Sequence, residues 1–198
     1  MNIVILAAGQ GKRMKSALPK VLQNLAGKPL LQYVLDTALS LLGKQVKQGP
    51  IVVVGHGAAD VKSFLAEHPV FNKVSTVLQA EQKGTGHALL QTLSKLDSQE
   101  PTLVLYGDVP LTSKRTLSIL AKLADGARGQ ESALALLTQN VDVPTGYGRI
   151  IRDSNGAVCA IVEEKDATFA QKQITEINTG IMVSVSYTHL TLPTNREV

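Results

Sequence analysis

Short apolar runs alternate with stretches of helical periodicity along most of this chain, and this alternation limits what the chain can fold into. The first four runs are continuously apolar, which is typical of strands buried on both faces of a parallel sheet. Strands that alternate with helices form right-handed crossover units. The pattern predicts an α/β fold with a doubly wound, mostly parallel sheet. The expected strands are residues 2–7, 51–54, 74–78, 102–106 and 133–137, and the expected helices are residues 30–42, 58–67, 86–96 and 113–123.

The last of these helices shows the pattern clearly. Leu117, Leu120, Ala121 and Ala124 fall at helical spacing, so they form one apolar face. Thr112 precedes them and is a suitable N-cap residue. We therefore expect a helix that begins after Thr112 and buries this face.

Composition narrows the class of partner. The chain has 198 residues, of which 44% are hydrophobic and 18% charged, as in a globular protein of one domain, or of one domain and part of another. Its formal net charge of +4 slightly favours small anionic ligands. Trp is absent and no Lys/Arg run interleaves with aromatic residues, so we expect no nucleic-acid partner. No apolar stretch reaches about 18 residues, so we expect no membrane partner either.

The cysteine and histidine content is uninformative about catalysis. The single Cys159 excludes a disulfide within the chain and fits a reducing compartment, so we expect a cytoplasmic protein. Cys159 lies in an apolar run and is predicted to be in the core. The four histidines lack metal-ligand spacing. His56 and His87 lie near the predicted pocket loops, and we expect both to be hydrogen-bonded loop residues.

Polar or glycine-rich segments follow three of the predicted strands. Residues 8–13 follow the first strand, Gln79 and the segment 84–86 follow the third, and Gly107 with Asp108 follow the fourth. Ligands of doubly wound sheets bind beyond the carboxyl ends of the strands. The three segments therefore predict one pocket at that edge.

The segment after the first strand has the chemistry of a phosphate-binding turn. Glycine permits a close backbone approach, backbone N–H groups can cradle phosphate oxygens, and a helix that starts there would add its dipole. The pair Gly9 and Gly11 lacks the third glycine of the dinucleotide-binding fingerprint and does not match the P-loop. A plain strand-to-loop turn with solvated charges at Lys12 and Arg13 is the alternative.

Six motifs in order resemble those of the sugar-nucleotide pyrophosphorylases, which are nucleotidyltransferases. The version that starts Leu-Ala-Ala-Gly and continues Ala-Gly-Lys-Pro is similar to the bacterial N-acetylglucosamine-1-phosphate uridylyltransferases. The motifs are LAAGQGKRMKSALPKVL (6–22), LQAEQKGTGHA (78–88), LYGDVPL (105–111), PTGYGRI (144–150), IVEEKDA (161–167) and EINTGI (176–181).

The resemblance implies a Rossmann-like nucleotidyltransferase fold of the glycosyltransferase-A type, and a Mg²⁺-dependent reaction. UTP and N-acetylglucosamine 1-phosphate would give UDP-N-acetylglucosamine and diphosphate, through in-line attack of the sugar phosphate on the α-phosphorus. Such chemistry requires positioning and charge neutralisation more than a protein nucleophile.

The resemblance also implies roles for individual residues at the nucleotide. Arg13 and Lys20 would neutralise the phosphates and Asp108 would bind Mg²⁺, so these three are the candidate catalytic residues. Lys12 stands where the family has Ser or Thr, and we assign it no role. A surface amide is the alternative for Gln79, and Thr85 would also suit the N-cap of the next helix, a role compatible with base reading. The uracil and ribose would be faced by the loop of Leu6, Ala7, Ala8 and Gly9. The uracil would be read by Gln79, Gly84 and Thr85, and the ribose side would be lined by Tyr106 and Gly107.

Three further residues match the family's sugar-binding set: Gly148, Glu163 and Asn178. Glycine would leave room for the sugar ring, and the two polar side chains would bind its hydroxyl and acetamido groups. Glu163 is chosen over Glu164 because it follows Ile161 and Val162 in the family register. A slip of one residue would reverse the face that it occupies.

The resemblance ends near Val183. We expect residues 1–183 to form a nucleotidyltransferase domain that is cut short, and residues 184–198 to be a tail foreign to the family. The family's second metal ligand, an Asn, has no counterpart here. Its C-terminal acetyltransferase β-helix, through which the intact parent would form a homotrimer, is also absent.

Two alternatives to this activity remain open on the sequence. The chain could be an inactive fragment that binds a nucleotide sugar or nothing, or it could transfer another nucleotide, cytidylyl or guanylyl. A nicotinamide dehydrogenase is disfavoured, because the third glycine and a ribose-binding acid are missing.

Overall fold

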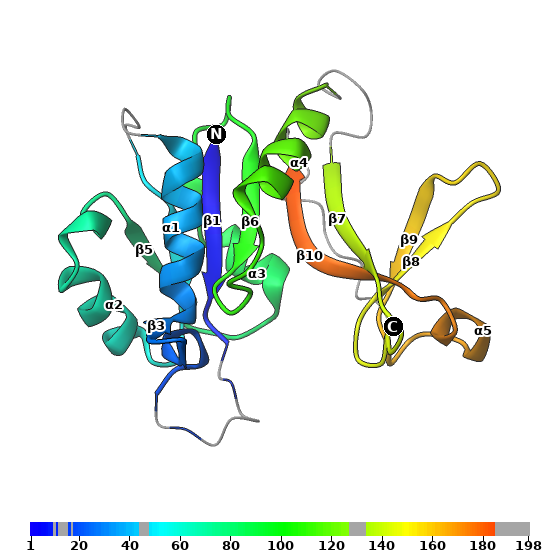
Figure 1. The fold of residues 1–198 in the computed structure, drawn as a ribbon, viewed down its shortest axis with the longest axis horizontal. Helices are drawn as coiled ribbons and strands as arrows, with labels where there is room; N and C mark the ends of the chain where they lie inside the picture. Colours follow the sequence, from blue (N-terminus) through cyan, green and yellow to red (C-terminus); the bar gives the residue numbers. More distant parts are fainter. Residues whose placement is uncertain (10, 12–15, 17, 44–47, 127–133, 185–198) are drawn as a thin grey trace. The chain divides into compact units, whose positions relative to one another are not determined.

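The computed structural model describes residues 1–9, 11, 16, 18–43, 48–126 and 134–184 (Figure 1). They form two compact units. The first comprises residues 1–135 with the described residues from 183 on, and the second comprises residues 136–182. Of the tail predicted over residues 184–198, Ser184 ends β10 (Glu176–Ser184) and residues 185–198 lie outside the described residues, so the predicted domain boundary stays a prediction.

The first unit is built on a parallel sheet with the strand order β5-β4-β1-β6. β1 spans Asn2–Ala7, β4 Ile51–Val54, β5 Ser75–Leu78 and β6 Thr102–Tyr106. β1 pairs in parallel with both β4 and β6, and β4 pairs in parallel with β5. Nearly every side chain of β1, β4 and β6 is buried, as their continuous apolar character predicts. β5 forms the end of this row and is only partly buried.

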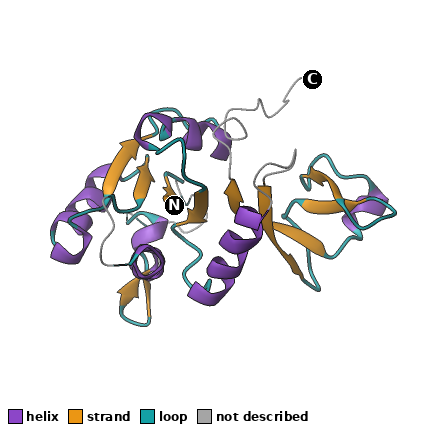
Figure 2. Cartoon of the chain, turned by 90° about the horizontal axis from the view of Figure 1, so that it is seen from above, coloured by secondary structure: helices purple, strands orange, loops and turns teal. Residues whose placement is uncertain are grey.

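Helices lie on both sides of these strands, so the predicted doubly wound architecture is confirmed (Figure 2). Among the described helices, none is long and apolar enough to cross a membrane.

The helices of the first unit are α1 (Leu30–Leu42), α2 (Ala58–Ala66), α3 (Thr85–Leu90) and α4 (Lys114–Gly126), with single 3-10 turns η2 (Lys20–Leu22), η3 (Pro69–Phe71) and η4 (Leu93–Lys95), and a short hairpin formed by β2 (Asn24–Leu25) and β3 (Lys28–Pro29).

Two helix predictions need correction. The helix expected over residues 86–96 is broken, because α3 ends at Leu90 and η4 begins only at Leu93. The buried Thr92 hydroxyl donates to the carbonyl of Leu89 in the gap. α4 is capped by Ser113 rather than Thr112, since the Ser113 hydroxyl accepts from the backbone N–H of Thr116.

The apolar face predicted for α4 is confirmed. Leu117, Leu120 and Ala124 are buried and Ala121 is half-buried, while Ile119 and Leu123 are exposed on the opposite side. The helix therefore has one face for the core and one for solvent.

In the second unit, β8 pairs in an antiparallel way with both β9 and β10, and β7 pairs with β10. Cys159 lies on β9 and is exposed, so the prediction that it is a core residue is wrong. β9 is covered on neither face over most of its length, and an apolar sequence there does not imply burial. The elements are β7 (Leu134–Asn140), β8 (Arg149–Arg152), β9 (Val158–Val162), α5 (Phe169–Lys172) and β10 (Glu176–Ser184).

A bidentate ion pair joins β8 to β10. Arg152 Nε donates to Glu176 Oε2 at 2.8 Å, and Arg152 Nη2 donates to Glu176 Oε1 at 2.7 Å. The hydrogen bonds from Arg152, with a further one from Thr138, lower the pKa of Glu176 to about 2. The carboxylate is therefore stabilised in its charged form by the fold.

We expect Glu176→Gln to destabilise the fold in a pH-dependent way. The folded pKa of about 2 lies below the ordinary 4.5, so the pair stabilises the fold above pH 4.5 and loses this effect as the pH falls towards 2. Water at Arg152, which is 42% exposed, screens the pair, and the loss at pH 7 should be about 1–2 kcal/mol.

Urea unfolding at pH 7 and at pH 3 checks this expectation, and the difference between parent and variant should be smaller at pH 3. Glu81→Gln is the control, because its partner Lys83 and Glu81 itself are both about two-thirds exposed. It should change the free energy of unfolding by less than about 0.5 kcal/mol. An equal loss at both pH values for Glu176→Gln would show that packing, not charge, is responsible.

Candidate functional site

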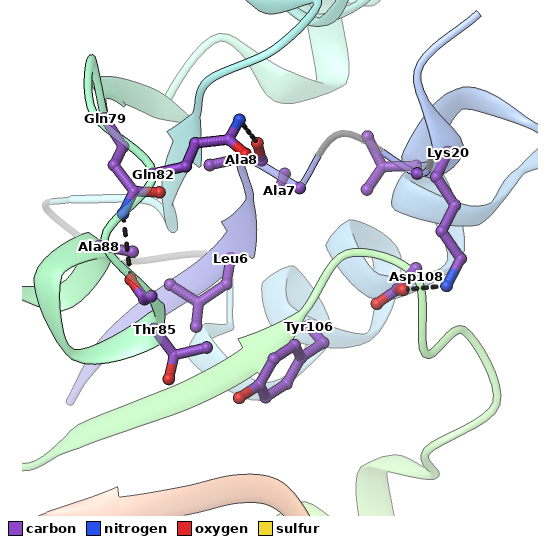
Figure 3. Close-up of a pocket in the computed structure, with 14 residues that line it drawn as sticks. Leu6, Ala7, Ala8, Lys20, Gln79, Gln82, Thr85, Ala88, Tyr106 and Asp108 are labelled. Carbon is purple, nitrogen blue, oxygen red and sulfur yellow. Dashed lines mark hydrogen bonds and ion pairs between the residues drawn. The ribbon is translucent and has the colours of Figure 1, made fainter. Parts of the chain in front are cut away.

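A pocket of about 500 Å³ opens beyond the carboxyl ends of β1, β5 and β6 (Figure 3). The parallel register, in which Leu6 pairs with Tyr106, brings these ends together. The predicted convergence of three strand ends on one site is therefore confirmed. The lining residues are Leu6, Ala7, Ala8, Gly9, Gly11, Lys20, Val21, Gln79, Gln82, Gly84, Thr85, Ala88, Tyr106 and Asp108.

Glycines let the backbone segments around the pocket approach closely. A Cβ on Gly55, which follows β4, would lie 2.8 Å from the carbonyl oxygen of Ala8 and 2.9 Å from its Cβ. Gly107 was predicted to line the ribose side. A Cβ there would lie 3.1 Å from Val21 and 3.4 Å from Ala7, so Gly107 contacts the residues that form the wall. Small residues therefore set the depth of the pocket.

Gln82 is a pocket residue that the sequence analysis missed. Its Nε2 donates to the carbonyl oxygen of Ala8 at 2.8 Å, and this bond ties the loop after β5 to the loop after β1. The only available signal was its place between Gln79 and Gly84 in a matched motif, where a long amide could reach a neighbouring loop.

Gln79 is 4% exposed, so the alternative of a surface amide is wrong. Its Nε2 donates to the carbonyl oxygen of Gly84 at 3.0 Å and lies 3.1 Å from Nδ1 of His87. Thr85 is the first residue of α3, and Gly84 holds the N-cap position without a side-chain cap. The predicted N-cap role of Thr85 is therefore wrong, and Thr85 is an exposed residue of the pocket wall.

Lys20 and Asp108 form an ion pair at the other end of the pocket (Figure 3). Lys20 Nζ lies 2.6 Å from Asp108 Oδ2, and the two side chains are 43% and 26% exposed. Gly11 has a φ of +57°, and a Cβ on it would lie 2.9 Å from Cβ of Lys20. Pro19 contacts Gly57, where φ is +70°. These contacts hold the start of η2 and direct Lys20 towards Asp108.

A helix that starts at the glycine turn would begin at residues 12–15, which lie outside the described residues, so the expected dipole there stays a prediction. Among the described residues after Gly11, the first helical element is the three-residue turn η2, which is too short to carry a macrodipole. Arg13 and Lys12 lie outside the described residues. Within the part of the pocket that is described, positive charge comes from Lys20.

The pocket offers one carboxylate to a metal ion. Among the residues that the structure describes, no group of three or more His, Cys, Asp or Glu side chains could hold a metal. Mg²⁺ is often bound by one or two carboxylates, with phosphate oxygens and water supplying the remaining ligands. Asp108, which is partly exposed and lines the pocket, fits that mode of binding.

The three predicted sugar-binding residues lie together in the second unit. The backbone N–H of Asn178 donates to the carbonyl oxygen of Gly148 at 2.8 Å. A Cβ on Gly148 would lie 3.5 Å from Oε1 of Glu163. Asn178 Oδ1 accepts from the N–H of Gly180 at 2.9 Å, which orients the amide.

Glu164, which the sequence analysis passed over, has a different environment. Its Oε2 accepts from Nη2 of the buried Arg149 at 2.7 Å and from the N–H of Gly146 at 3.1 Å. The hydrogen bonds from Arg149 and then Gly146 lower the pKa of Glu164. The Glu164 carboxylate is therefore already hydrogen-bonded within the second unit, while the side chain of Glu163 lies beside Gly148.

Comparison with known proteins finds related sequences and folds. The family model of the MobA-like NTP transferase domain matches residues 3–169 of this chain. The chain is 55% identical over 184 residues to the bifunctional protein GlmU of Burkholderia orbicola (strain AU 1054), covering 93% of this chain and 38% of that protein. It is 54% identical over 183 residues to the bifunctional protein GlmU of Cupriavidus taiwanensis, covering 92% and 37%. The chain thus spans less than two-fifths of the length of these relatives.

A solved structure supports the fold. The structure of UDP-glucose pyrophosphorylase complexed with UDP-glucose has a TM-score of 0.76 to this chain and 18% sequence identity, covering 96% of this chain and 77% of that one. At this identity the likeness concerns the fold alone, and it confirms the expected Rossmann-like nucleotidyltransferase architecture.

We expect Gly55→Ala to destabilise the pocket although residue 55 does not line it. The added methyl group would overlap the Ala8 backbone and lower the free energy of unfolding by about 1–3 kcal/mol. Gly9→Ala is the matched control, because a Cβ on Gly9 meets nothing within 4 Å. Thermal unfolding of both variants checks this. Parent-like stability of Gly55→Ala would contradict the close approach of the two segments.

Proposed function

This chain belongs to the family with the MobA-like NTP transferase domain, as its motifs predicted, and we propose that it is a sugar-phosphate nucleotidyltransferase. Specifically, we propose that it joins UTP and N-acetylglucosamine 1-phosphate to give UDP-N-acetylglucosamine and diphosphate. The observation that carries the proposal is the difference in chemistry between the two ends of the pocket. A buried amide lies at one end, an ion pair lies at the other, and small apolar residues lie between them (Figure 3).

The end with Gln79 suits a pyrimidine base. Leu6, Ala8 and Ala88 offer flat, apolar contact area, and Gln79 is the buried polar side chain among them. An amide can both donate to and accept from the edge of a base. Because Gly84 and Thr85 border the same space, a base held there would be read by backbone groups as well.

The end with Lys20 and Asp108 suits the triphosphate. The Lys20 ammonium neutralises phosphate oxygens once it is released from Asp108, and Arg13 is proposed as a second cation. Asp108 would then hold Mg²⁺, which supplies charge neutralisation to the α-phosphate and to the leaving diphosphate. The sugar phosphate oxygen forms a bond to the α-phosphorus, and the bond from that phosphorus to the bridging oxygen breaks. These residues orient the phosphates and need not move a proton.

The residues of the second unit are proposed to bind the sugar. Glu163 accepts from sugar hydroxyl groups, and the amide nitrogen of Asn178 donates, while the bond from the N–H of Gly180 to its oxygen holds the amide in place. We further propose that the product serves peptidoglycan and lipopolysaccharide synthesis in the cytoplasm, and that the protein acts in a homotrimer formed through segments beyond this chain.

Calorimetric titration of this chain with UDP-N-acetylglucosamine and Mg²⁺ tests the proposal, with UDP-glucose and GDP-mannose as competitors. Selective binding of UDP-N-acetylglucosamine is the expected result. A parallel assay for diphosphate release from UTP or CTP with N-acetylglucosamine 1-phosphate tests turnover. Equal binding of all three nucleotide sugars by a folded sample would overturn the substrate assignment.

We expect Lys20→Met to weaken UTP binding by about 10- to 100-fold, because one charge-assisted contact to phosphate is lost. Binding of uridine, which lacks phosphate, should not change. Lys28→Met is the matched control, since Lys28 forms a similar ion pair with Asp36 at 2.8 Å but does not line the pocket. Calorimetry with both ligands measures the effect. Equal weakening of uridine and UTP would place Lys20 away from the phosphates.

A further inference from the structure

The hydrogen bonds behind Gln79 point to a specificity-determining role for a residue outside the pocket lining. We propose that His87 fixes the orientation of the Gln79 amide, so that the amide oxygen rather than the NH₂ group faces the base. This inference rests on the proposed function, because it assumes that a base binds at this end of the pocket. His87 would act through Gln79 and would not touch the ligand.

Both hydrogens of the Gln79 amide have partners within the protein. One lies towards the carbonyl oxygen of Gly84 at 3.0 Å, and the other lies towards Nδ1 of His87 at 3.1 Å. An amide NH₂ has two hydrogens, so neither remains for a ligand. The dashed line from the amide nitrogen of Gln79 in Figure 3 is its hydrogen bond to the carbonyl oxygen of residue 84, and the amide oxygen lies on the other side. The group presented to a base is therefore the acceptor Oε1.

The imidazole of His87 must accept at Nδ1 for this arrangement to hold. A neutral imidazole has one donor and one acceptor nitrogen, so the proton then resides on Nε2. Nε2 of Gln91, four residues along the chain, lies 3.2 Å from Nε2 of His87 and donates to the backbone carbonyl oxygen of His87 at 3.3 Å. A proton on Nε2 of His87 therefore requires the Gln91 amide to turn its oxygen to the ring and to give up that backbone hydrogen bond. With Gln91 turned in this way, the chain Gln91–His87–Gln79 has one consistent direction.

This direction determines which pyrimidine fits. The N3 position of uracil carries a hydrogen and donates, whereas N3 of cytosine has a lone pair and accepts. Oε1 of Gln79 therefore pairs with uracil and repels cytosine at that position. If the amide were reversed, Oε1 would face the lone pairs of His87 Nδ1 and of the Gly84 carbonyl. Selection of uracil is then a property of the hydrogen-bond chain and not of Gln79 alone.

Calorimetric affinities for UDP and CDP test the proposal, because the two nucleotides share the same phosphates. The parent should prefer UDP. His87→Ala removes the acceptor at Nδ1, and the UDP-to-CDP affinity ratio should fall by about tenfold. His87→Asn can place its side-chain oxygen near the position of Nδ1 and should restore most of the ratio. His56→Ala, a change of an exposed histidine that does not line the pocket, should leave the ratio unchanged.

The outcomes separate the inference from the proposed function. A parent that binds neither nucleotide, or both equally, overturns the proposed base recognition and this inference with it. A parent that prefers UDP, with His87→Ala retaining the parent ratio, overturns the inference and leaves the function standing. If His87→Ala lowers both affinities equally, His87 has only a structural role, and the inference is overturned.

The tautomer of His87 provides a test that needs no variant. Nitrogen NMR of the parent chain distinguishes an imidazole protonated at Nε2 from one protonated at Nδ1. We expect the proton on Nε2 in the free protein and in the presence of UDP. A proton on Nδ1 would require the Gln79 amide to be reversed and would overturn the proposal.

Discussion

The parallel pairing of β1 with β4 on one side and β6 on the other is the constraint on which the site depends. These three strands are buried and mostly apolar, and their polar side chains lie at the strand ends, so most polar groups lie at or beyond a strand end. The fixed register brings those ends to the same edge. Gln79 and Asp108 are separated by 29 positions in the sequence, yet both border one pocket. The polar side chains that could bind a ligand therefore gather at one edge of the sheet, because its interior is apolar.

Much of this fold could be predicted from the sequence, for reasons visible in particular elements. The bounds of β1, β4, β6 and α1 agree with the prediction, because continuous apolar runs and helical spacing directly encode burial. Cys159 was misplaced because its strand has an apolar sequence without a covering layer. Ser113 replaced Thr112 as a cap because adjacent hydroxyl residues differ only in backbone geometry, which composition does not encode.

The candidate site was predictable from the sequence to about the same extent as the fold. Residues that belong to matched motifs at strand ends, such as Gln79, Lys20 and Asp108, do line the pocket. Contacts that depend on how loops fold back were not predictable. Gln82 reaches Ala8 across 74 positions, and His87 meets Gln79 only because α3 begins directly after a glycine with a positive φ. Motif matching identifies which residues border a ligand, whereas three-dimensional contacts identify which residues hold them in place.

The ion pair between Lys20 and Asp108 has a consequence for how easily the pocket fills and empties. In the free chain, each of these charges already has a partner. When phosphate oxygens take the place of the carboxylate beside Lys20, the ammonium exchanges one anion for another, and the Asp108 carboxylate is left to a cation that arrives with the phosphates. Each charge then has a partner both before and after the ligand binds, so the electrostatic free energy changes less than it would if an unpaired charge were buried. A site of this kind is suited to binding and releasing highly charged ligands together with their counterion.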